Sequence, residues 1–401
     1  MAADPKNSNG ATAGAGAMLQ AIRRTESTTR AELVAWTGLA RSTVAQRIEA
    51  LLAHDLVVPV GENASTGGRP PQAFAFNAHA GVILTADLGA THGRLAVTDL
   101  RARVIAEESH DIAIADGPDA VLTWLEDAFH ALLETTPRTA ADVVGVGVGV
   151  PGPVEFATGT PVAPPIMPGW DGYPVARRLA EHFEAPTLVD NDVNIMALGE
   201  HWMAYHDADH MLFVKVGTGI GCGIITDGRI HRGALGAAGD IGHIHILGHD
   251  DVLCRCGNQG CLEAVAGGAA VAAKLSAEGI SAQNTRDVVT LVREGRPRAV
   301  QLVRQAGREL GEVLASAVNF FNPGIIVIGG DMADANEPLL AGVRQLVYQR
   351  AVPLGTRSLR ITRSTLDDRA GVVGAAVMLI EHIFSPDAVD ARLAEVAAPV
   401  P

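Results

Sequence analysis

Residues 236–263 read GAAGDIGHIHILGHDDVLCRCGNQGCLE, and the second half of this stretch carries a metal-binding pattern. Three of the four cysteines of the chain follow the spacing C-x-C-x4-C, at Cys254, Cys256 and Cys261. Three thiols in one short loop are typical of a metal site and form a poor disulfide framework. Zinc needs a fourth soft or imidazole ligand, which we expect to be His243, with His245 and His249 as alternatives. The competing interpretation is three free cysteines.

A closed site of three cysteines and one histidine would be structural, because no coordination position stays open for a catalytic water. The fourth cysteine, Cys222, lies apart in a Gly-rich segment and is expected to be a small buried residue. The pattern therefore predicts a structural zinc ion that fastens one loop of a larger domain.

Composition and charge set the limits for the rest of the chain. Of its 401 residues 48% are apolar and 19% charged, which is enough for two or three domains with sizeable cores. The formal net charge is −14, which argues against a nucleic-acid partner for the chain as a whole. Residues 17–76, however, hold six Arg against five acids, so this segment is near neutral. No apolar run is long enough for a signal peptide or a membrane span, and we expect a cytoplasmic protein.

The segment 15–78 predicts a winged helix-turn-helix that binds double-stranded DNA. A short helix from Arg30 to Thr37 is expected to be capped by Thr28 or Thr29 and to end at Gly38. A second helix, 41–52, buries Val44, Ile48, Leu51 and Leu52 on one stripe. Its outer face would present Arg41, Ser42, Thr43, Gln46 and Arg47 to a major groove.

A wing is expected after these helices, between the apolar runs 56–60 and 73–76. The loop Gly67-Gly68-Arg69-Pro70 would place Arg69 where a wing reaches the minor groove. The alternative interpretation of the whole segment is a small helical dimerisation domain with an ordinary hairpin.

The remainder of the chain alternates strands and helices and predicts two α/β lobes. Each lobe opens on a hairpin that turns at a Gly/Thr motif, which suggests a duplicated nucleotide-binding fold. We expect disordered tails at residues 1–14 and 386–401. Between them we expect the winged helix-turn-helix at 15–78, the first lobe at 80–195 with 370–384, and the second lobe at 196–369.

Two Gly/Thr turns are candidates for binding phosphate. Gly lets backbone N–H groups approach an anion, Thr adds a hydroxyl, and a nearby Asp can orient a cation or water. The candidates are Asp87, Gly89 and Thr91 in the first lobe, and Gly217, Thr218 and Gly219 in the second. The alternative for each is a tight hairpin turn without a ligand.

The segment Val189-Asp190-Asn191-Asp192-Val193-Asn194 ends a strand with two carboxylates and two amides. A carboxylate there could deprotonate a sugar hydroxyl while an amide orients it. A polar cap between strand and helix explains the same residues and is favoured by the segment taken alone.

Taken together, these motifs resemble the ROK family (repressor, open reading frame, kinase) from about residue 17 to residue 384. The specific carriers are residues 236–243 and 254–263, supported by the weaker motifs 87–91, 151–153, 189–194 and 216–223. The resemblance implies an actin-like, hexokinase-like pair of lobes with a cleft between them. Members with an N-terminal winged helix are typically regulators, whereas the kinases typically lack that head.

The resemblance also implies a sugar site and a reaction that it could once have served. It assigns sugar contacts to Asn191, Asp192, Asp240, His243 and Glu263, with Asp192 as the vestigial or working kinase base. Relative to the family kinases, Ala90 and His92 replace a Gly and a Lys, Asp240 replaces a Glu, and Pro165 stands near a usual Asn. These departures favour sugar binding without useful phosphorylation.

The sequence therefore predicts a sugar-responsive DNA-binding regulator of carbohydrate metabolism genes, and specifically a repressor. Its partners would be operator DNA, a sugar or sugar phosphate, and further copies of itself in a homodimer or homotetramer. The rival hypothesis is an ATP-dependent sugar kinase with a regulatory head, which alone would require ATP and magnesium. A third hypothesis keeps the regulator but gives it a protein effector and a vestigial cleft.

Overall fold

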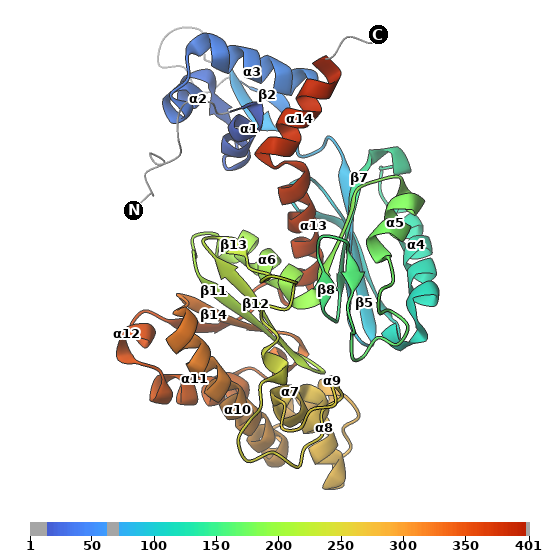
Figure 1. Ribbon diagram of the computed structural model, residues 1–401, viewed down its shortest axis with the longest axis vertical. Helices are drawn as coiled ribbons and strands as arrows, with labels where there is room; N and C mark the ends of the chain where they lie inside the picture. The colour runs from blue at the N-terminus through green and yellow to red at the C-terminus, as the bar shows by residue number, and fades with distance from the viewer. Residues whose placement is uncertain (1–13, 62–71, 398–401) are drawn as a thin grey trace.

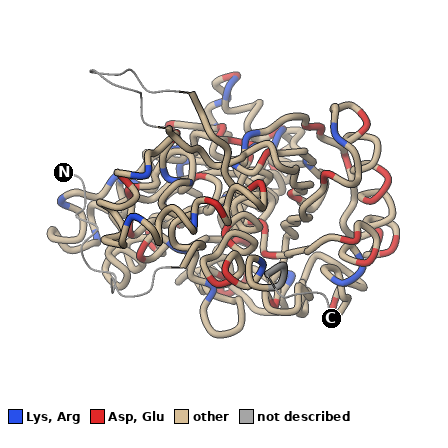
Figure 2. Tube along the Cα trace, turned by 90° about the horizontal axis from the view of Figure 1, so that it is seen from above, with Lys and Arg blue, Asp and Glu red and all other residues tan. Residues whose placement is uncertain are grey.

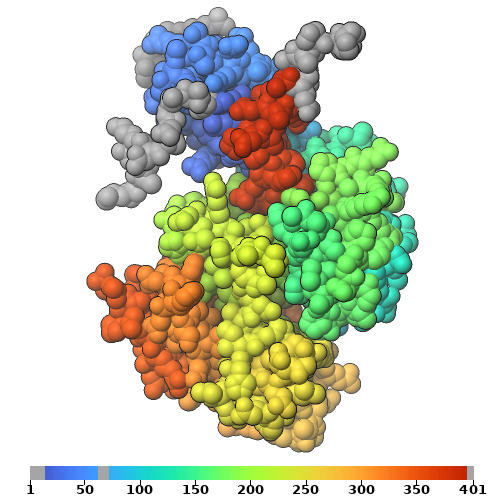
Figure 3. Space-filling model, viewed as in Figure 1, coloured from blue at the N-terminus to red at the C-terminus, as the bar shows by residue number. Residues whose placement is uncertain are grey.

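A small N-terminal head sits above two lobes in the computed structural model, which describes residues 14–61 and 72–397 (Figures 1 and 3). The head holds helices α1 (Ala15–Arg23), α2 (Arg30–Thr37) and α3 (Arg41–Ala53). Its sheet has the order β1-β3-β2, with β1 at Thr28–Thr29, β2 at Val57–Val60 and β3 at Ala73–Phe76. Three helices and a hairpin sheet in this order form a winged helix-turn-helix, as predicted.

The helix boundaries of the head follow from local chemistry. The Thr29 side chain and Glu32 form a reciprocal capping box at the start of α2, and α2 ends at Gly38 with φ +67°. On α3 the residues Val44, Ile48 and Leu51 are buried, as the stripe predicted. The predicted wing tip, Gly67–Pro70 with Arg69, lies outside the described residues.

The two lobes repeat one strand order, which confirms the predicted duplication. The first sheet runs β10-β7-β4-β5-β6, with β4 Val82–Leu88, β5 His92–Thr98, β6 Val104–Asp111, β7 Val143–Val150 and β10 Thr187–Asn191. The second runs β13-β12-β11-β14-β15, with β11 Met211–Val216, β12 Ile220–Thr226, β13 Arg229–Ile230, β14 Ile325–Gly329 and β15 Arg360–Arg363. In each sheet an antiparallel three-stranded meander is extended by two parallel strands on its first strand.

The outer helices cover one face of each sheet (Figure 1). In the first lobe these are α4 (Pro118–Glu134) and α5 (Val175–Phe183), beside a small hairpin of β8 (Val154–Glu155) and β9 (Thr160–Pro161). The second lobe has α7 (Leu262–Ala266), α8 (Gly268–Ala277), α9 (Thr285–Arg293), α10 (Pro297–Phe321), α11 (Glu337–Arg350) and α12 (Pro353–Thr356). Their apolar faces form a separate core in each lobe.

Helices α6 (Asp192–Ala204) and α13 (Ala370–Ile383) cross between the two sheets. The crossing is close because two glycines face backbone: a Cβ at Gly374 would lie 1.6 Å from the Ile195 carbonyl oxygen, and one at Gly199 would lie 2.2 Å from that of Ala370. Helix α13 packs on β4 and β7 of the first sheet, as predicted, and α6 on β11 and β12 of the second. The predicted boundary between residues 195 and 196 therefore falls inside α6.

The expectation of a disordered tail at 386–401 was wrong for most of that segment. Residues Pro386–Ala397 form helix α14, which packs against α1 of the head. Val389 and Leu393, one helical turn apart, both pack against the same core. The Ala-rich composition of the segment obscures this helical spacing in the sequence. The Gly16 backbone N–H donates a 2.8 Å hydrogen bond to the Asp390 carboxylate. The predicted tail 1–14 lies outside the described residues except for Gly14.

No single helix within residues 14–61 and 72–397 is long and apolar enough to cross a membrane. Only the bent pair of Asp367–Ile383 with Pro386–Ala394 meets the length and composition criteria together.

Candidate functional site

A cleft of about 400 Å³ lies between the two lobes and collects most of the predicted site residues. The first lobe contributes Asp87, Asn191 and Asp192, and the second contributes Gly217, Thr218, Gly219, Asp240, His243 and Glu263. Gly89 and Thr91, predicted to bind phosphate, are not among the residues that line it. Asp and Glu residues are spread widely along the chain rather than gathered in one place (Figure 2).

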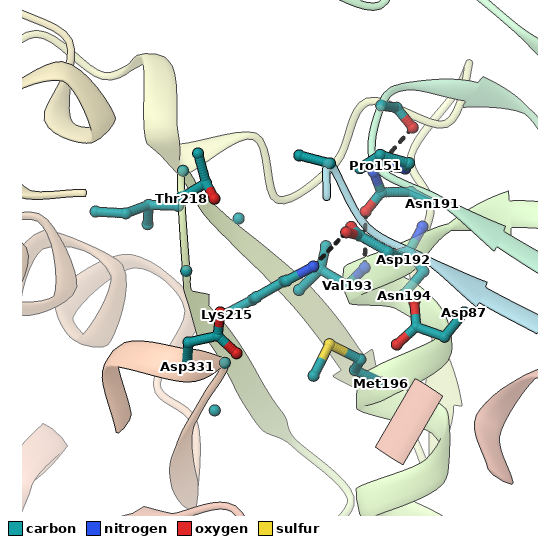
Figure 4. Close-up of a pocket in the computed structure, with 18 of the residues that line it drawn as sticks. Asp87, Pro151, Asn191, Asp192, Val193, Asn194, Met196, Lys215, Thr218 and Asp331 are labelled. Carbon is teal, nitrogen blue, oxygen red and sulfur yellow. Dashed lines mark hydrogen bonds and ion pairs between the residues drawn. The ribbon is translucent and has the colours of Figure 1, made fainter. Parts of the chain in front are cut away.

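Asn191 and Asp192 stand where β10 passes into α6. The Asn191 side-chain oxygen accepts a 3.0 Å hydrogen bond from the Val193 backbone N–H, so Asn191 caps α6. Its amide nitrogen donates a 2.8 Å bond to the Gly152 carbonyl. The polar-cap interpretation is thus correct for Asn191, while Asp192 points its carboxylate into the cleft (Figure 4).

Asp190 is a structural anchor below this junction. Its carboxylate is buried, accepts from the Asn194 amide at 2.8 Å and pairs with Arg232 at 2.7 Å. Arg232 in turn lies 3.6 Å from the centre of the Phe156 ring. A buried carboxylate needs such partners, and these hold the first turn of α6 in place beneath Asp192.

Sequence reasoning missed Lys215, which lies opposite Asp192 in the cleft. The Lys215 Nζ donates to the Asp192 Oδ2 at 2.5 Å, across the boundary between the lobes (Figure 4). Partial burial lowers the pKa of Lys215, but attraction to Asp192 and Asp87 outweighs it and raises that pKa overall. The available signal was a single charged residue in an otherwise apolar strand, MLFVKV, directly before a Gly loop.

Asp87 lies one residue before the end of β4 and lines the cleft, close to α13. A Cβ at Gly371 would lie 2.0 Å from its Oδ2, and its Oδ1 is buried without a hydrogen-bond partner within residues 14–61 and 72–397. Burial raises the pKa of Asp87 to about 7, although Lys215 opposes the shift. Asp87 therefore titrates near neutral pH rather than near its ordinary value of 3.8.

We expect the variant Asp87→Asn to be more stable than wild type at pH 8 and to lose much of that advantage at pH 5. A carboxyl whose pKa is raised on folding favours the folded state when protonated, and that stability is lost as pH rises from about 4 through about 7. Thermal unfolding of both proteins from pH 5 to pH 8 measures the difference in Tm. A difference that stays constant over this range would contradict the raised pKa.

The two predicted phosphate loops have different structures. In the first turn Gly89 N–H donates to the His92 carbonyl at 2.8 Å, and Ala90 does not adopt a positive φ. Alanine at position 90 is therefore compatible with the backbone of this turn. The His92 ring covers Gly89, within 2.8 Å of where a Cβ would stand. In the second turn Gly217 N–H donates to Gly219 at 3.0 Å, and this loop does line the cleft.

The cysteine cluster brings together four ligand atoms, from Cys254, Cys256, Cys261 and His243, that all lie within 4.8 Å of one another. The Cys256 and Cys261 sulfurs are 3.7 Å apart, and the Cys254 sulfur is 3.7 Å from His243 Nδ1. A tetrahedral ion with ~2.3 Å bonds holds its sulfur ligands about 3.8 Å apart. This group of residues could therefore hold a metal ion.

The alternative histidines have other partners. His245 Nε2 lies 2.9 Å from an oxygen of Asp250, and His249 Nε2 lies 3.7 Å from an oxygen of Glu309. His243 instead has Nδ1 toward the cysteines and Nε2 3.9 Å from Asp240 on the cleft side. Cys222, the fourth cysteine, is buried apart from the cluster as predicted.

Asp240 and Glu263 place carboxylates on either side of His243. A Glu263 oxygen lies 4.0 Å from His243 Nδ1 and 3.5 Å from the Cys254 sulfur. The other Glu263 oxygen lies 2.6 Å from where a Gly219 Cβ would stand, so a side chain at position 219 would displace this carboxylate. The metal cluster, Glu263 and the second Gly loop thus form one connected wall of the cleft.

The outer face of α3 presents the predicted DNA-contacting residues of the helix. Arg41, Ser42 and Gln46 are exposed, and Thr43 and Arg47 are half-buried. Their neighbours Val44 and Ile48 are buried in the head core. This polar face on the second helix of a helix-turn-helix is the surface that such motifs place in a major groove.

Comparison with known proteins identifies the class of this chain. The ROK family model matches residues 83–382, so the chain belongs to the ROK family. The xylose repressor of Caldicellulosiruptor bescii is 31% identical over 382 residues, covering 92% of this chain and 95% of the repressor.

Two solved structures separate the head from the lobes. A ROK family transcriptional regulator, described as a homologue of the E. coli MLC protein, superposes with a TM-score of 0.81 at 26% identity, covering 95% of this chain and 98% of that one. A ROK family glucokinase from Streptomyces griseus, solved with glucose and AMPPNP, gives a TM-score of 0.67 at 26% identity. The match covers 99% of the glucokinase but only 74% of this chain.

Proposed function

We propose that this chain is a sugar-responsive transcriptional repressor whose head binds operator DNA and whose cleft binds the sugar. One observation carries the proposal: a single helix, α13, connects the cleft to the head. Its second residue, Gly371, lies against Asp87, which lines the cleft. The residue after it, Phe384, packs edge-on against Phe76 of the head at 5.2 Å.

The contact between α13 and the head is built to transmit a displacement. Arg23 of α1 stacks on the rings of Phe76 and Phe384, at 5.6 and 5.3 Å from their centres. Gln20 donates a 2.6 Å hydrogen bond to the Phe384 carbonyl. Sugar binding that changes the angle between the lobes would shift α13 and, in an oligomer, the spacing of two heads on DNA.

The residues that we assign to each ligand are those of the two polar surfaces. Operator DNA is read by Arg41, Ser42, Thr43, Gln46 and Arg47, together with Arg69 of the wing that the sequence predicts. The sugar is held by Asn191, Asp192, Asp240, His243 and Glu263. The metal of the cysteine cluster is a structural zinc ion, whose ligand His243 also borders the sugar. The active species is a homodimer or homotetramer, because such heads usually bind two half-sites.

Binding of purified protein to the DNA fragment upstream of its own gene tests the proposal, followed by fluorescence anisotropy. We expect tight binding that one neutral sugar from a panel including D-xylose, D-glucose and N-acetylglucosamine weakens by tenfold or more. The salt concentration and the total ionic charge of the solution must be held constant, since DNA affinity depends steeply on the salt concentration. Binding of DNA that no sugar of a broad panel alters would favour a protein effector instead.

The rival activity, an ATP-dependent sugar kinase, has Asp192 and the second Gly loop in its favour. A kinase needs a free base at the sugar hydroxyl and space for the terminal phosphate and its magnesium ion. Here the Asp192 carboxylate is already paired with Lys215. A coupled assay should detect no phosphorylation of the bound sugar. Turnover of about one per second in wild type that Asp192→Asn abolishes would instead establish a kinase.

A further inference from the structure

Lys215 occupies an unusual position for a charged residue. Strand β11 is the middle strand of its five-stranded sheet, and its other residues are all buried and apolar. Lys215 pairs in register with Gly221 of β12 and Gly329 of β14. Because neither neighbour has a side chain, the lysine has room to extend over the sheet toward the first lobe.

The choice of lysine is also distinctive for this chain. Lysine occurs at only three positions, 6, 215 and 274, whereas Arg supplies all the other fixed cations. Lysine ends in a compact ammonium, while arginine ends in a broad planar fork. A compact charge fits a place where one carboxylate must be met at close range within a cleft.

The Lys215 ammonium interacts electrostatically with several carboxylates. It is 2.5 Å from Asp192, whose side chain is 9% exposed, while that of Lys215 is 20% exposed. Asp87 and Asp331 also attract it and help to raise its pKa. Figure 4 shows the lysine extending from the second lobe to Asp192, with Asp331 near its base.

A nucleotide-dependent sugar kinase brings a cation to this kind of site from outside, as a divalent ion bound to the terminal phosphates. The chain instead carries a permanent cation on Lys215, directly beside the base and two residues before Gly217, where the Gly217–Gly219 turn begins. We infer that Lys215 is a specificity-determining residue that replaces the nucleotide-borne cation. It holds Asp192 as an acceptor for a sugar hydroxyl and confines the cleft to an unphosphorylated sugar, bound without nucleotide.

The charge of the cleft supports the preference for a neutral ligand. Of the charged residues that line it, nine are Asp or Glu and three are Lys or Arg. Lys215 is paired with Asp192, and Arg94 pairs with Asp368 at 3.2 Å, so most of the positive charge is already neutralised. Carboxylates accept hydrogen bonds from sugar hydroxyls but repel a phosphate ester.

This inference rests on the proposed function for its sugar arm, whereas its nucleotide arm can be tested alone. Isothermal titration would measure binding of magnesium AMPPNP and of the panel sugars and their phosphate esters. The proteins are wild type, Lys215→Met, which removes the charge, and Lys215→Arg, which keeps it. The matched control is Lys274→Met, because Lys274 binds the Val265 carbonyl away from the cleft.

For wild type we expect magnesium AMPPNP to change the affinity for the sugar by less than twofold. Phosphate esters should bind at least tenfold more weakly than the free sugar. Lys215→Met should bind the sugar at least tenfold more weakly and gain measurable affinity for magnesium AMPPNP. Lys215→Arg should still exclude the nucleotide, and Lys274→Met should match wild type. Circular dichroism and thermal unfolding verify that each variant is folded.

Three results would overturn the inference: nucleotide binding by wild type, preference of wild type for a phosphate ester, or a folded Lys215→Met that neither loses sugar affinity nor gains nucleotide affinity. If wild type binds operator DNA but no sugar, the sugar half of the proposed function fails. The comparison of nucleotide binding between wild type and Lys215→Met then still decides the role of Lys215.

Discussion

The triple variant Arg41→Ala, Gln46→Ala, Arg47→Ala should lose at least a hundredfold in affinity for the operator fragment while the head stays folded. Each well-formed contact to a base edge contributes about 1–3 kcal/mol of discrimination, and removal of two arginines also weakens attraction to phosphate. Arg41 and Gln46 are exposed and Arg47 is half-buried, whereas Val44 and Ile48 of the same helix are buried in the head core. Fluorescence anisotropy on operator and on scrambled DNA of equal length measures the loss.

Single variants separate reading of sequence from general attraction. Gln46→Ala should relax the preference for operator over scrambled DNA, whereas Arg69→Ala should weaken both by similar factors. Glu49→Ala is the control, because Glu49 is exposed on the same helix and its replacement removes only a negative charge. Unaltered operator affinity in the triple variant would show that α3 is not the recognition helix.

The head and the metal cluster were predictable because short-range patterns determine them. Thr29, Glu32 and Gly38 set the ends of α2 through contacts within a few residues. The C-x-C-x4-C spacing likewise places three sulfurs in one loop, and only the choice among three histidines needed the structure. The doubled strand order of the lobes was also accessible, since each lobe repeats a hairpin that turns at a Gly/Thr motif.

Features that depend on contacts between distant segments could not be predicted from the sequence. Helix α14 is held by α1, nearly four hundred residues earlier in the chain, as in the bond from Gly16 to Asp390. The pairing of Lys215 with Asp192 arises because the lobes place β11 opposite the start of α6. Gly89 and Thr91 resembled their counterparts in the second lobe, but the His92 ring covers Gly89. Such outcomes follow from tertiary packing rather than from local spacing.

Removal of the metal should affect both the stability of the second lobe and the response to sugar. Protein purified without chelator should contain about one zinc ion per chain, and Cys254→Ser should contain almost none. An ion present at about a thousand times its dissociation constant stabilises the folded state by ~4 kcal/mol, so the variant should unfold at a clearly lower temperature. Elemental analysis and thermal unfolding measure the two effects.

The sugar response should fail in the same variant, because the proposed metal ion would orient a wall of the cleft. His243 has one ring nitrogen toward the cysteines and the other 3.9 Å from Asp240, and Glu263 lies 3.5 Å from the Cys254 sulfur. Loss of the ion frees both side chains, so the sugar should bind at least tenfold more weakly while operator binding persists. His245→Ala is the control, since His245 neither belongs to the cluster nor lines the cleft. Absence of zinc from wild type, together with a full sugar response in Cys254→Ser, would show that the cluster is a set of free cysteines with no part in either property.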